Sequence, residues 1–284
     1  MNQSLTWHDY TAHKAADNHT VVGCLKVLEH LYSPQLGNER DILLYLPPSY
    51  SHSQKGYPVI YMHDGQNLFD EVTSFAGEWH VDSTMETLST EGVEAIVVGI
   101  PNAGPKRIEE YAPFYDPQHG DSRHGDKYLT FITDTLKPLI DRDFRTLPQR
   151  AHTGIMGSSL GGLISLYAFF QYPDTFGFVG AMSPSLWFAN QAIFSYIKEA
   201  AFFPGKIYLD IGSLEYAGAI NDGIASGKKS KPYQGSVCHM CGLLQQKGYQ
   251  PGVDLSCVEE EGAGHAESAW ANRLPEALRF LLGK

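Results

Sequence analysis

The sequence carries little positive charge, and this excludes two classes of partner. Among its 284 residues, Lys and Arg number 21 and Asp and Glu number 32, so the formal net charge is −11. Proteins bind nucleic acids and anionic membrane surfaces through basic stripes. The one basic cluster, Lys-Lys-Ser-Lys at 228–231, lies in a Gly- and Ser-containing stretch typical of a solvated loop. We therefore expect neither a nucleic-acid partner nor a membrane partner.

Long hydrophobic runs are also absent, and cysteines are few. No segment is apolar for long enough to span a bilayer. Residues 1–9 lack the charged and apolar regions of an export signal. Without such a signal, we expect the four cysteines to be reduced thiols rather than a disulfide framework. These features together predict a cytoplasmic protein.

Patterns that would bind a metal are weak. Cys238 and Cys241 have C-x-x-C spacing, but no second pair of ligands lies nearby, so we expect thiols packed in a helix. The other candidate is a polar run that we interpret as a hydrated loop, and it contains His119, Asp121, His124 and Asp126. The sequence therefore predicts no metal and no other cofactor.

An alternation of strand and helix patterns is present along the chain. The length, a hydrophobic content of 43% and the absence of a linker predict a single domain over residues 1–284, with a homo-oligomer possible. Antiparallel strands are expected at about 20–47. Further strands are expected at 57–62, 95–100, 152–156, 178–182, 206–211 and 253–258, and helices at 78–92, 127–142, 161–170, 192–202, 236–247 and 266–282. This order predicts an α/β fold with a mostly parallel central sheet and helices on both faces.

Gly157-x-Ser159-x-Gly161, at 157–161, has the spacing of a nucleophile elbow. Such a turn between strand and helix is so tight that residues two before and two after the serine must be small. An apolar run of strand length precedes it, and a helical pattern follows. We therefore predict that Ser159 is a catalytic nucleophile rather than part of an ordinary Gly/Ser-rich turn.

A serine nucleophile needs a base, and the base needs a third group that fixes its tautomer. His265 follows the last predicted strand, where the base belongs, whereas the other histidine after the elbow, His239, falls inside a predicted helix. For the acid we favour Glu215, which lies in a loop, over Asp210 at the end of a strand. Asp222 remains a further alternative.

Two backbone N–H groups should stabilise the oxyanion. We expect one at Leu160, directly after the nucleophile, and one at Gly65 or Gln66, in the loop after the strand at 57–62. Three aromatic residues could line a substrate pocket or belong to the core, namely Trp187, Tyr111 and Trp79. The polar segment 101–126 is long enough to suggest a functional loop, which could close over the pocket.

Several short motifs resemble one known family. These are Asp64-Gly65-Gln66-Asn67-Leu68-Phe69, Glu78-Trp79, Gly157-x-Ser159-x-Gly161-Gly162, Met182-Ser183-Pro184-Ser185-Leu186-Trp187, Asp210-x-Gly212-x-x-Glu215 and Gly264-His265-x-Glu267-x-x-Trp270. Together they look like the putative-esterase branch of the α/β-hydrolases, which is related to enterochelin esterases, feruloyl esterases, esterase D and the mycolyltransferases. The resemblance runs from about residue 21 to the end, and it implies that Ser159, His265 and Glu215 form the triad. Glu215 stands where many relatives have Asp.

The function predicted from these residues is hydrolysis of a small or medium carboxylic ester through an acyl-enzyme. The same triad could serve acyl transfer or thioester hydrolysis, so these remain alternatives within catalysis. A binding protein that keeps the fold without turnover is an alternative of another class.

Overall fold

The computed structural model describes residues 5–13, 18–117, 123–216 and 234–283, and for 12–13, 216 and 234–235 it describes the backbone alone. Its strands form one sheet of nine, in the order β1-β2-β3-β5-β4-β6-β7-β8-β9. The strands are β1 (His8–Asp9), β2 (Cys24–Ser33), β3 (Asn38–Leu46), β4 (Val59–His63), β5 (Ile96–Ile100), β6 (Thr153–Ser158), β7 (Phe178–Met182), β8 (Lys206–Gly212) and β9 (Leu255–Glu260). The pairs among β1, β2, β3 and β5 are antiparallel, and those from β5 through β4 to β9 are parallel. The predicted antiparallel start and parallel core are confirmed.

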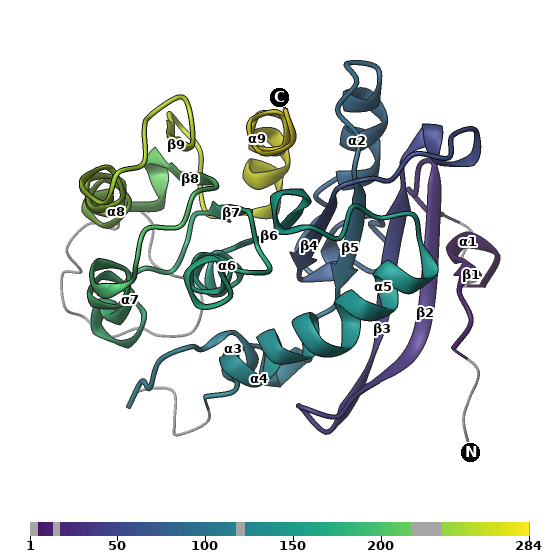
Figure 1. Ribbon diagram of the computed structural model, residues 1–284, viewed down its shortest axis with the longest axis horizontal. Coiled ribbons are helices and arrows are strands. Elements are labelled where there is room, and N and C mark those ends of the chain that lie inside the picture. Colours follow the sequence, from purple (N-terminus) through teal and green to yellow (C-terminus); the bar gives the residue numbers. More distant parts are fainter. Residues whose placement is uncertain (1–4, 14–17, 118–122, 217–233, 284) are drawn as a thin grey trace.

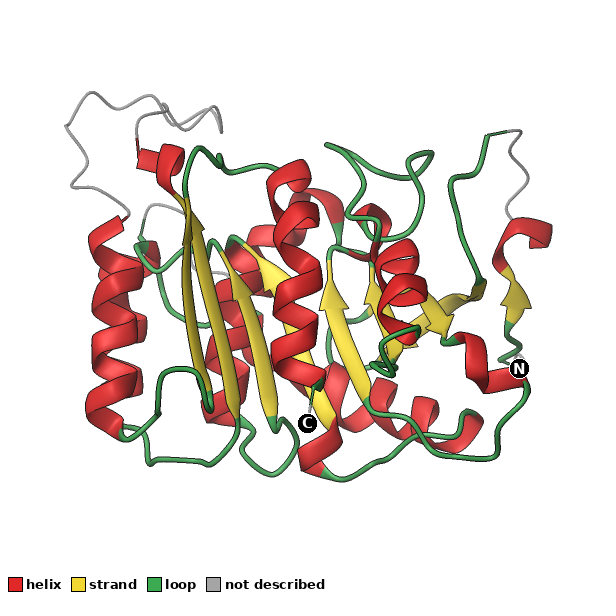
Figure 2. Cartoon of the chain, turned by 90° about the horizontal axis from the view of Figure 1, so that it is seen from above, coloured by secondary structure: helices red, strands yellow, loops and turns green. Residues whose placement is uncertain are grey.

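Helices cover both faces of this sheet (Figures 1 and 2). The helices are α1 (Tyr10–His13), α2 (Val81–Ser89), α3 (Arg107–Tyr111), α4 (Gly125–Thr130), α5 (Lys137–Asp143), α6 (Leu160–Gln171), α7 (Phe188–Glu199), α8 (Gln234–Lys247) and α9 (Glu267–Leu282). Buried residues of α2 and α9 share one hydrophobic cluster, and those of α3 to α8 share the other. Alternate residues of a strand point to opposite faces, so β4 supplies Ile60 and Met62 to the first cluster and Val59 and Tyr61 to the second. The predicted α/β architecture is therefore observed.

Some elements differ from the sequence prediction. The helix expected at 127–142 consists of α4, a π-helical turn at Phe131–Leu136 and α5. The segment 101–126, expected to be a loop, contains α3, and its residues 118–122 lie outside the described part of the chain. The pair β1 and α1 was not predicted, because two to four residues are too few to show a period.

The expectation of four reduced cysteines is wrong. Cys241 in α8 and Cys257 in β9 form a disulfide, while Cys24 and Cys238 are free and exposed. The two bonded residues are 16 positions apart in the sequence, and packing of the helix beside the strand brings their Cα atoms to 6.4 Å. A spacing of this length has no recognisable pattern in the sequence. The argument from thiols for a cytoplasmic location therefore no longer holds, and that location stays a prediction.

Membrane insertion through a helix is not seen in the described residues, where no helix combines the length and apolarity needed to cross a bilayer. The same residues contain no group of three or more His, Cys, Asp or Glu side chains that could hold a metal ion. Of the four residues of the polar run at 119–126, His119 and Asp121 lie outside the part of the chain that the structure describes. Nδ1 of His124 lies 3.9 Å from Oε2 of Glu109, and the Asp126 side chain accepts a hydrogen bond from Tyr167.

Candidate active site

Ser159 occupies the sharp turn between β6 and α6. Its φ is 56° and its ψ is −122°, a conformation that a residue with a side chain rarely adopts. The flanking glycines are required by close contacts with His63, the last residue of β4. A Cβ on Gly157 would lie 2.8 Å from Cδ2 of His63, and one on Gly161 would lie 3.3 Å from its Cβ. The geometry of a nucleophile elbow is thus present at Ser159.

Neighbouring strands fix this turn through its backbone. The Ser159 amide donates to the carbonyl of Met182 in β7 at 3.0 Å, and the Ser159 carbonyl accepts from the amide of Ser185 at 3.0 Å. The hydroxyl groups of Ser159 and Ser185 lie 3.2 Å apart. The end of β7 and the loop after it therefore fix the backbone of the predicted nucleophile.

His265 lies in the loop between β9 and α9, and its imidazole contacts the predicted acid. Nδ1 of His265 is 2.9 Å from Oε2 of Glu215, although the two residues are 50 positions apart. The imidazole is 32% exposed, whereas the Glu215 side chain is 1% exposed. Burial alone would raise the pKa of Glu215, but hydrogen bonds from His265 and Ser183 hold that pKa below its ordinary value.

Asp210, the alternative acid, has different partners. Its side chain is fully buried at the end of β8, where it pairs with Nε of Arg273 at 2.8 Å and accepts from the amide of Ser183 at 2.9 Å. Burial outweighs the attraction of Arg273 and raises the pKa of Asp210 to about 6. Asp222 lies outside the described residues. Of the described candidates for the acid, Glu215 is the one hydrogen-bonded to His265.

The loop after β4 presents the predicted oxyanion donors. This loop contains a 3-10 turn at Gly65–Asn67, in which the amides of Asn67 and Leu68 donate to the carbonyls of Asp64 and Gly65. The amides of Gly65 and Gln66 lie before these donors, at the N-terminal end of the turn. The Leu160 amide lies in the same way at the N-terminal end of α6, where amides have no partner within the helix. The Leu160 amide is also at the positive end of that helix dipole.

Asp64 and Arg107 hold the start of this loop. Asp64 has a left-handed φ of 54°, and its carboxylate receives Nε and Nη2 of Arg107 at 2.7 and 2.8 Å. Burial would raise the pKa of Asp64, but the Arg107 guanidinium holds it below its ordinary value. The sequence placed Arg107 in a long polar segment and could not identify its partner 43 positions away.

His63 is a further residue of the site that sequence reasoning missed. It is 2% exposed, it supports both elbow glycines, and its Nδ1 lies 2.7 Å from the hydroxyl of Tyr128. Burial lowers the pKa of His63 to about 3, so the ring is neutral at neutral pH. A neutral ring adds no positive charge beneath the elbow, and its contribution is therefore to packing. Only its position before the predicted oxyanion loop could have drawn attention to it.

The three aromatic residues proposed for a pocket are not equivalent. Trp79 is 3% exposed and its ring packs on Trp270, with the ring centroids 5.7 Å apart. Tyr111 is fully buried and its hydroxyl accepts a hydrogen bond from the amide of Asp64. Their burial favours the second of the two alternatives predicted for them, that they belong to the core. Trp187 is partly buried against the hydrophobic cluster that α3 to α8 share, and it remains a candidate for lining the substrate pocket.

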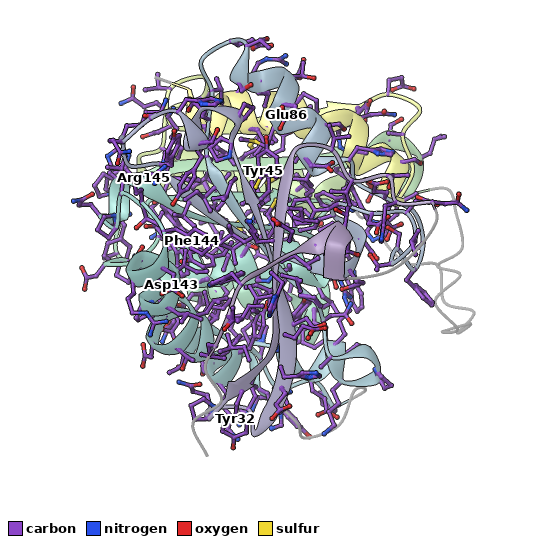
Figure 3. All side chains as sticks on the ribbon, turned by 90° about the vertical axis from the view of Figure 1, so that its right-hand side faces the viewer. Tyr32, Tyr45, Glu86, Asp143, Phe144 and Arg145 are labelled. Atoms are coloured by element: carbon purple, nitrogen blue, oxygen red, sulfur yellow. A yellow bond between two sulfur atoms is a disulfide. The ribbon has the colours of Figure 1, made fainter. Side chains whose placement is uncertain are left out.

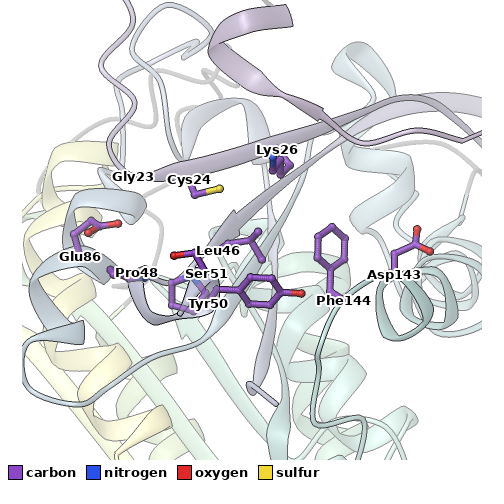
Figure 4. Close-up of a pocket in the computed structure, with 11 residues that line it drawn as sticks. Gly23, Cys24, Lys26, Leu46, Pro48, Tyr50, Ser51, Glu86, Asp143 and Phe144 are labelled. Atoms are coloured by element: carbon purple, nitrogen blue, oxygen red, sulfur yellow. The ribbon is translucent and has the colours of Figure 1, made fainter. Parts of the chain in front are cut away.

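A cavity of about 660 Å³ lies elsewhere, beside the antiparallel strands. Figure 3 shows this side of the molecule, and Figure 4 shows the residues that line the cavity. They come from the start of β2, the end of β3 and the segment after it, α2, and the end of α5 with the residue that follows. They include Cys24, Lys26, Tyr50, Glu86 and Phe144. None of the predicted catalytic residues lines it, so this cavity is not the candidate active site.

The fold and the elbow together define the class of this protein, an α/β-hydrolase, and similarity to known proteins supports the same class. Residues 33–281 match the model of the family described as "Putative esterase". The chain belongs to this family, and it is an ester-hydrolysing enzyme.

Individual relatives agree with this assignment. The chain is 31% identical over 256 residues to the uncharacterized protein YbbA of Bacillus subtilis, which covers 87% of this chain and 94% of the relative. It is 29% identical over 185 residues to the siderophore enterobactin esterase of Emericella nidulans, covering 57% of this chain and 60% of that one. Among solved structures, the BES protein from Bacillus cereus aligns with a TM-score of 0.68 at 22% identity, over 94% of this chain and 98% of that chain. This last similarity concerns the fold alone.

Proposed function

We propose that this enzyme hydrolyses carboxylic esters through an acyl-enzyme on Ser159, with His265 as the general base and Glu215 as the acid of the triad. The observation that carries the proposal is the 2.9 Å contact between Nδ1 of His265 and Glu215. This contact fixes the tautomer with the proton on Nδ1, so that Nε2 is the nitrogen that takes the proton from Ser159.

The proposed cycle has two halves. Oγ of Ser159 attacks the ester carbonyl while His265 removes its proton, and the tetrahedral oxyanion is stabilised by the amides of Leu160 and of Gly65 or Gln66. The carbon–oxygen bond to the alcohol breaks, and His265 gives its proton to the departing alkoxide. Water then attacks the acyl-enzyme with the same histidine as base, which releases the acid and restores Ser159.

The substrate proposed is a small-molecule ester. A siderophore enterobactin esterase is similar over part of this chain, as is the ferri-bacillibactin esterase BesA of Bacillus subtilis, at 30% identity over 157 residues. A siderophore ester is therefore the first natural substrate to assay, beside p-nitrophenyl esters of graded chain length. Activity across that series measures the size of the acyl pocket.

The test is covalent labelling with a fluorophosphonate. We expect the wild-type protein to be labelled at Ser159 and to lose esterase activity in parallel, and Ser159→Ala to be neither labelled nor active. Ser33→Ala, which removes a buried hydroxyl in β2, is the matched control and should be labelled normally. Full activity of folded Ser159→Ala would reject the proposal.

Product analysis with added alcohol or thiol acceptors separates hydrolysis from acyl transfer, and equal activity on a thioester would favour the thioesterase alternative.

A further inference from the structure

Ser183 stands directly behind the proposed acid. It follows β7, it is fully buried, and its φ is 42°. Its hydroxyl oxygen lies 2.6 Å from Oε1 of Glu215, 2.9 Å from Nε1 of Trp270 and 2.9 Å from Nη2 of Arg273. The indole and the guanidinium can only donate hydrogen bonds, so the single hydroxyl proton must point to Glu215. The chemistry of the neighbours thus fixes the direction of this bond.

Arg273 is held as rigidly as Ser183. Its side chain is 3% exposed, and each of its nitrogens donates to a different acceptor. Nε pairs with Asp210 at 2.8 Å, Nη1 with Glu260 at 3.0 Å and Nη2 with the Ser183 hydroxyl. Nη2 also lies 3.8 Å from Oε1 of Glu215. A planar guanidinium with three fixed partners cannot rotate without breaking several charge-assisted bonds.

Helix α9 supports the base as well as the acid. Trp270 and Arg273 are three residues apart and therefore share one face of this helix. The Trp270 ring meets the His265 ring edge to face, with centroids 4.9 Å apart and planes at 86°. One rigid helix thus contacts the imidazole through a ring and the carboxylate through Ser183.

Resting on the proposed function, we propose that Ser183 and Arg273 are positioning residues of the reaction. Together they hold Glu215 in the orientation that receives the Nδ1 proton of His265. Arg273 also pairs with Asp210, so Asp210 serves as the counterion of the guanidinium. Glu215, five residues later, faces His265 instead. This arrangement explains why Glu215, rather than Asp210, contacts His265.

The first test replaces the hydroxyl. Ser183→Ala should lower kcat about tenfold to a hundredfold, which corresponds to one hydrogen bond to a charged group, and should leave KM nearly unchanged. Without this donor, protonation of the Glu215–His265 pair becomes easier, so the acidic limb of the kcat/KM profile should move to higher pH. Two charged groups act directly on this pair, Arg273 on Glu215 and Glu267 on His265. Around them, Asp210 and Glu260 pair with Arg273, and Asp64 and Arg107 act on Glu267. Ser33→Ala, the matched loss of a buried hydroxyl, should change neither quantity.

The second test asks whether Trp270 acts through Ser183. Trp270→Phe keeps a ring against His265 but removes the indole N–H, and we expect a smaller loss of kcat because Arg273 still donates to Ser183. In the Ser183→Ala background the same change should add little, as a double-mutant cycle would measure. Arg273→Lys keeps the charge but not the planar fork, and it should lower kcat as Ser183→Ala does.

The outcomes separate this inference from the proposed function. If Ser183→Ala, Trp270→Phe and Arg273→Lys all keep the wild-type kcat and pH profile while Ser159→Ala is inactive, the positioning role is wrong and the triad stands. Fully additive effects of Ser183→Ala and Trp270→Phe would also overturn the role. An active Ser159→Ala protein would instead reject the proposed function itself. A Ser183→Ala variant that does not fold leaves the test to Trp270→Phe and Arg273→Lys.

Discussion

Gly65, in the loop after β4, packs tightly against the end of the neighbouring strand β5. A Cβ on this residue would be 2.7 Å from backbone atoms of Gly99, Ile100 and Pro101. Because those atoms belong to the end of β5 and the following residue, they cannot move aside as a flexible side chain could. The position of the proposed oxyanion amides therefore depends on the absence of a side chain here.

Gly65→Ala should consequently shift this loop and lower kcat by about a hundredfold, the typical loss when one oxyanion donor is removed. The measurement is steady-state hydrolysis of a p-nitrophenyl ester. Gly242→Ala is the control, because a Cβ there meets nothing within 4 Å in α8. That variant should keep its activity and gain up to about 1 kcal/mol in stability. An unchanged kcat in Gly65→Ala would contradict the assignment of this loop.

Asp82, in the first turn of α2, links stability to pH. Burial raises its pKa to about 6, against hydrogen bonds from the amides of Val22 and Ser83. An acid whose pKa is raised in the folded state contributes stability that is fully present below its ordinary pKa. That contribution is lost as the pH rises through about 6.

Asp82→Asn should remove this part of the pH dependence, because an amide does not titrate in this range. The free energy of unfolding, measured with urea at a series of pH values, should fall less steeply between about pH 4 and 6 in the variant than in the wild type. Asp134→Asn, at an exposed position, should leave the slope unchanged. Parallel curves for wild type and Asp82→Asn would show the prediction to be wrong.

At the scale of elements, the disulfide fastens α8 to β9. Closing a loop of 16 residues restricts the unfolded chain, and the corresponding stabilisation is about 3 kcal/mol. Since β9 leads into the loop that carries His265, this fastening also secures one end of that loop.

Cys257→Ser should therefore lower the free energy of unfolding by about 3 kcal/mol, measured by urea denaturation without reductant. Reductant should lower the free energy of unfolding of the wild-type protein by a similar amount and leave that of the variant unchanged. Cys24→Ser, which replaces a free and exposed thiol, is the control and should behave as the wild type. Identical midpoints for oxidised and reduced wild type would contradict a stabilising disulfide.

At the scale of the whole molecule, two hydrophobic clusters share the strands of one sheet. A strand such as β4 contributes to both faces, so loss of one cluster exposes the other. This sharing favours the single domain predicted from the sequence.

We accordingly expect one cooperative transition. Tryptophan fluorescence reports on both clusters, because Trp79 and Trp270 lie in one and Trp7 and Trp187 border the other. Its urea midpoint should coincide with that of far-ultraviolet circular dichroism. Two separated midpoints would indicate independently folding parts.

The sequence by itself determined the features that local patterns encode. Apolar runs and helical periods predicted the strands β2 to β9 and most helices, because burial on one face imposes a period on the residues of an element. The elbow was readable since its glycines are required within five consecutive residues. The order of Ser159, Glu215 and His265 along the chain was enough to predict a serine, an acid and a base as candidates for a triad.

Only the tertiary structure decided the contacts between distant residues. The bond between Ser183 and Arg273 spans 90 positions, and that between Ser183 and Trp270 spans 87. The Cys241–Cys257 disulfide and the partners of Asp210 likewise depend on how helices pack against the sheet. Such contacts have no local period, because they arise when the sheet brings the ends of separate strands together and burial then selects which polar groups must pair. Which of Glu215 and Asp210 contacts His265 depends on packing of this kind.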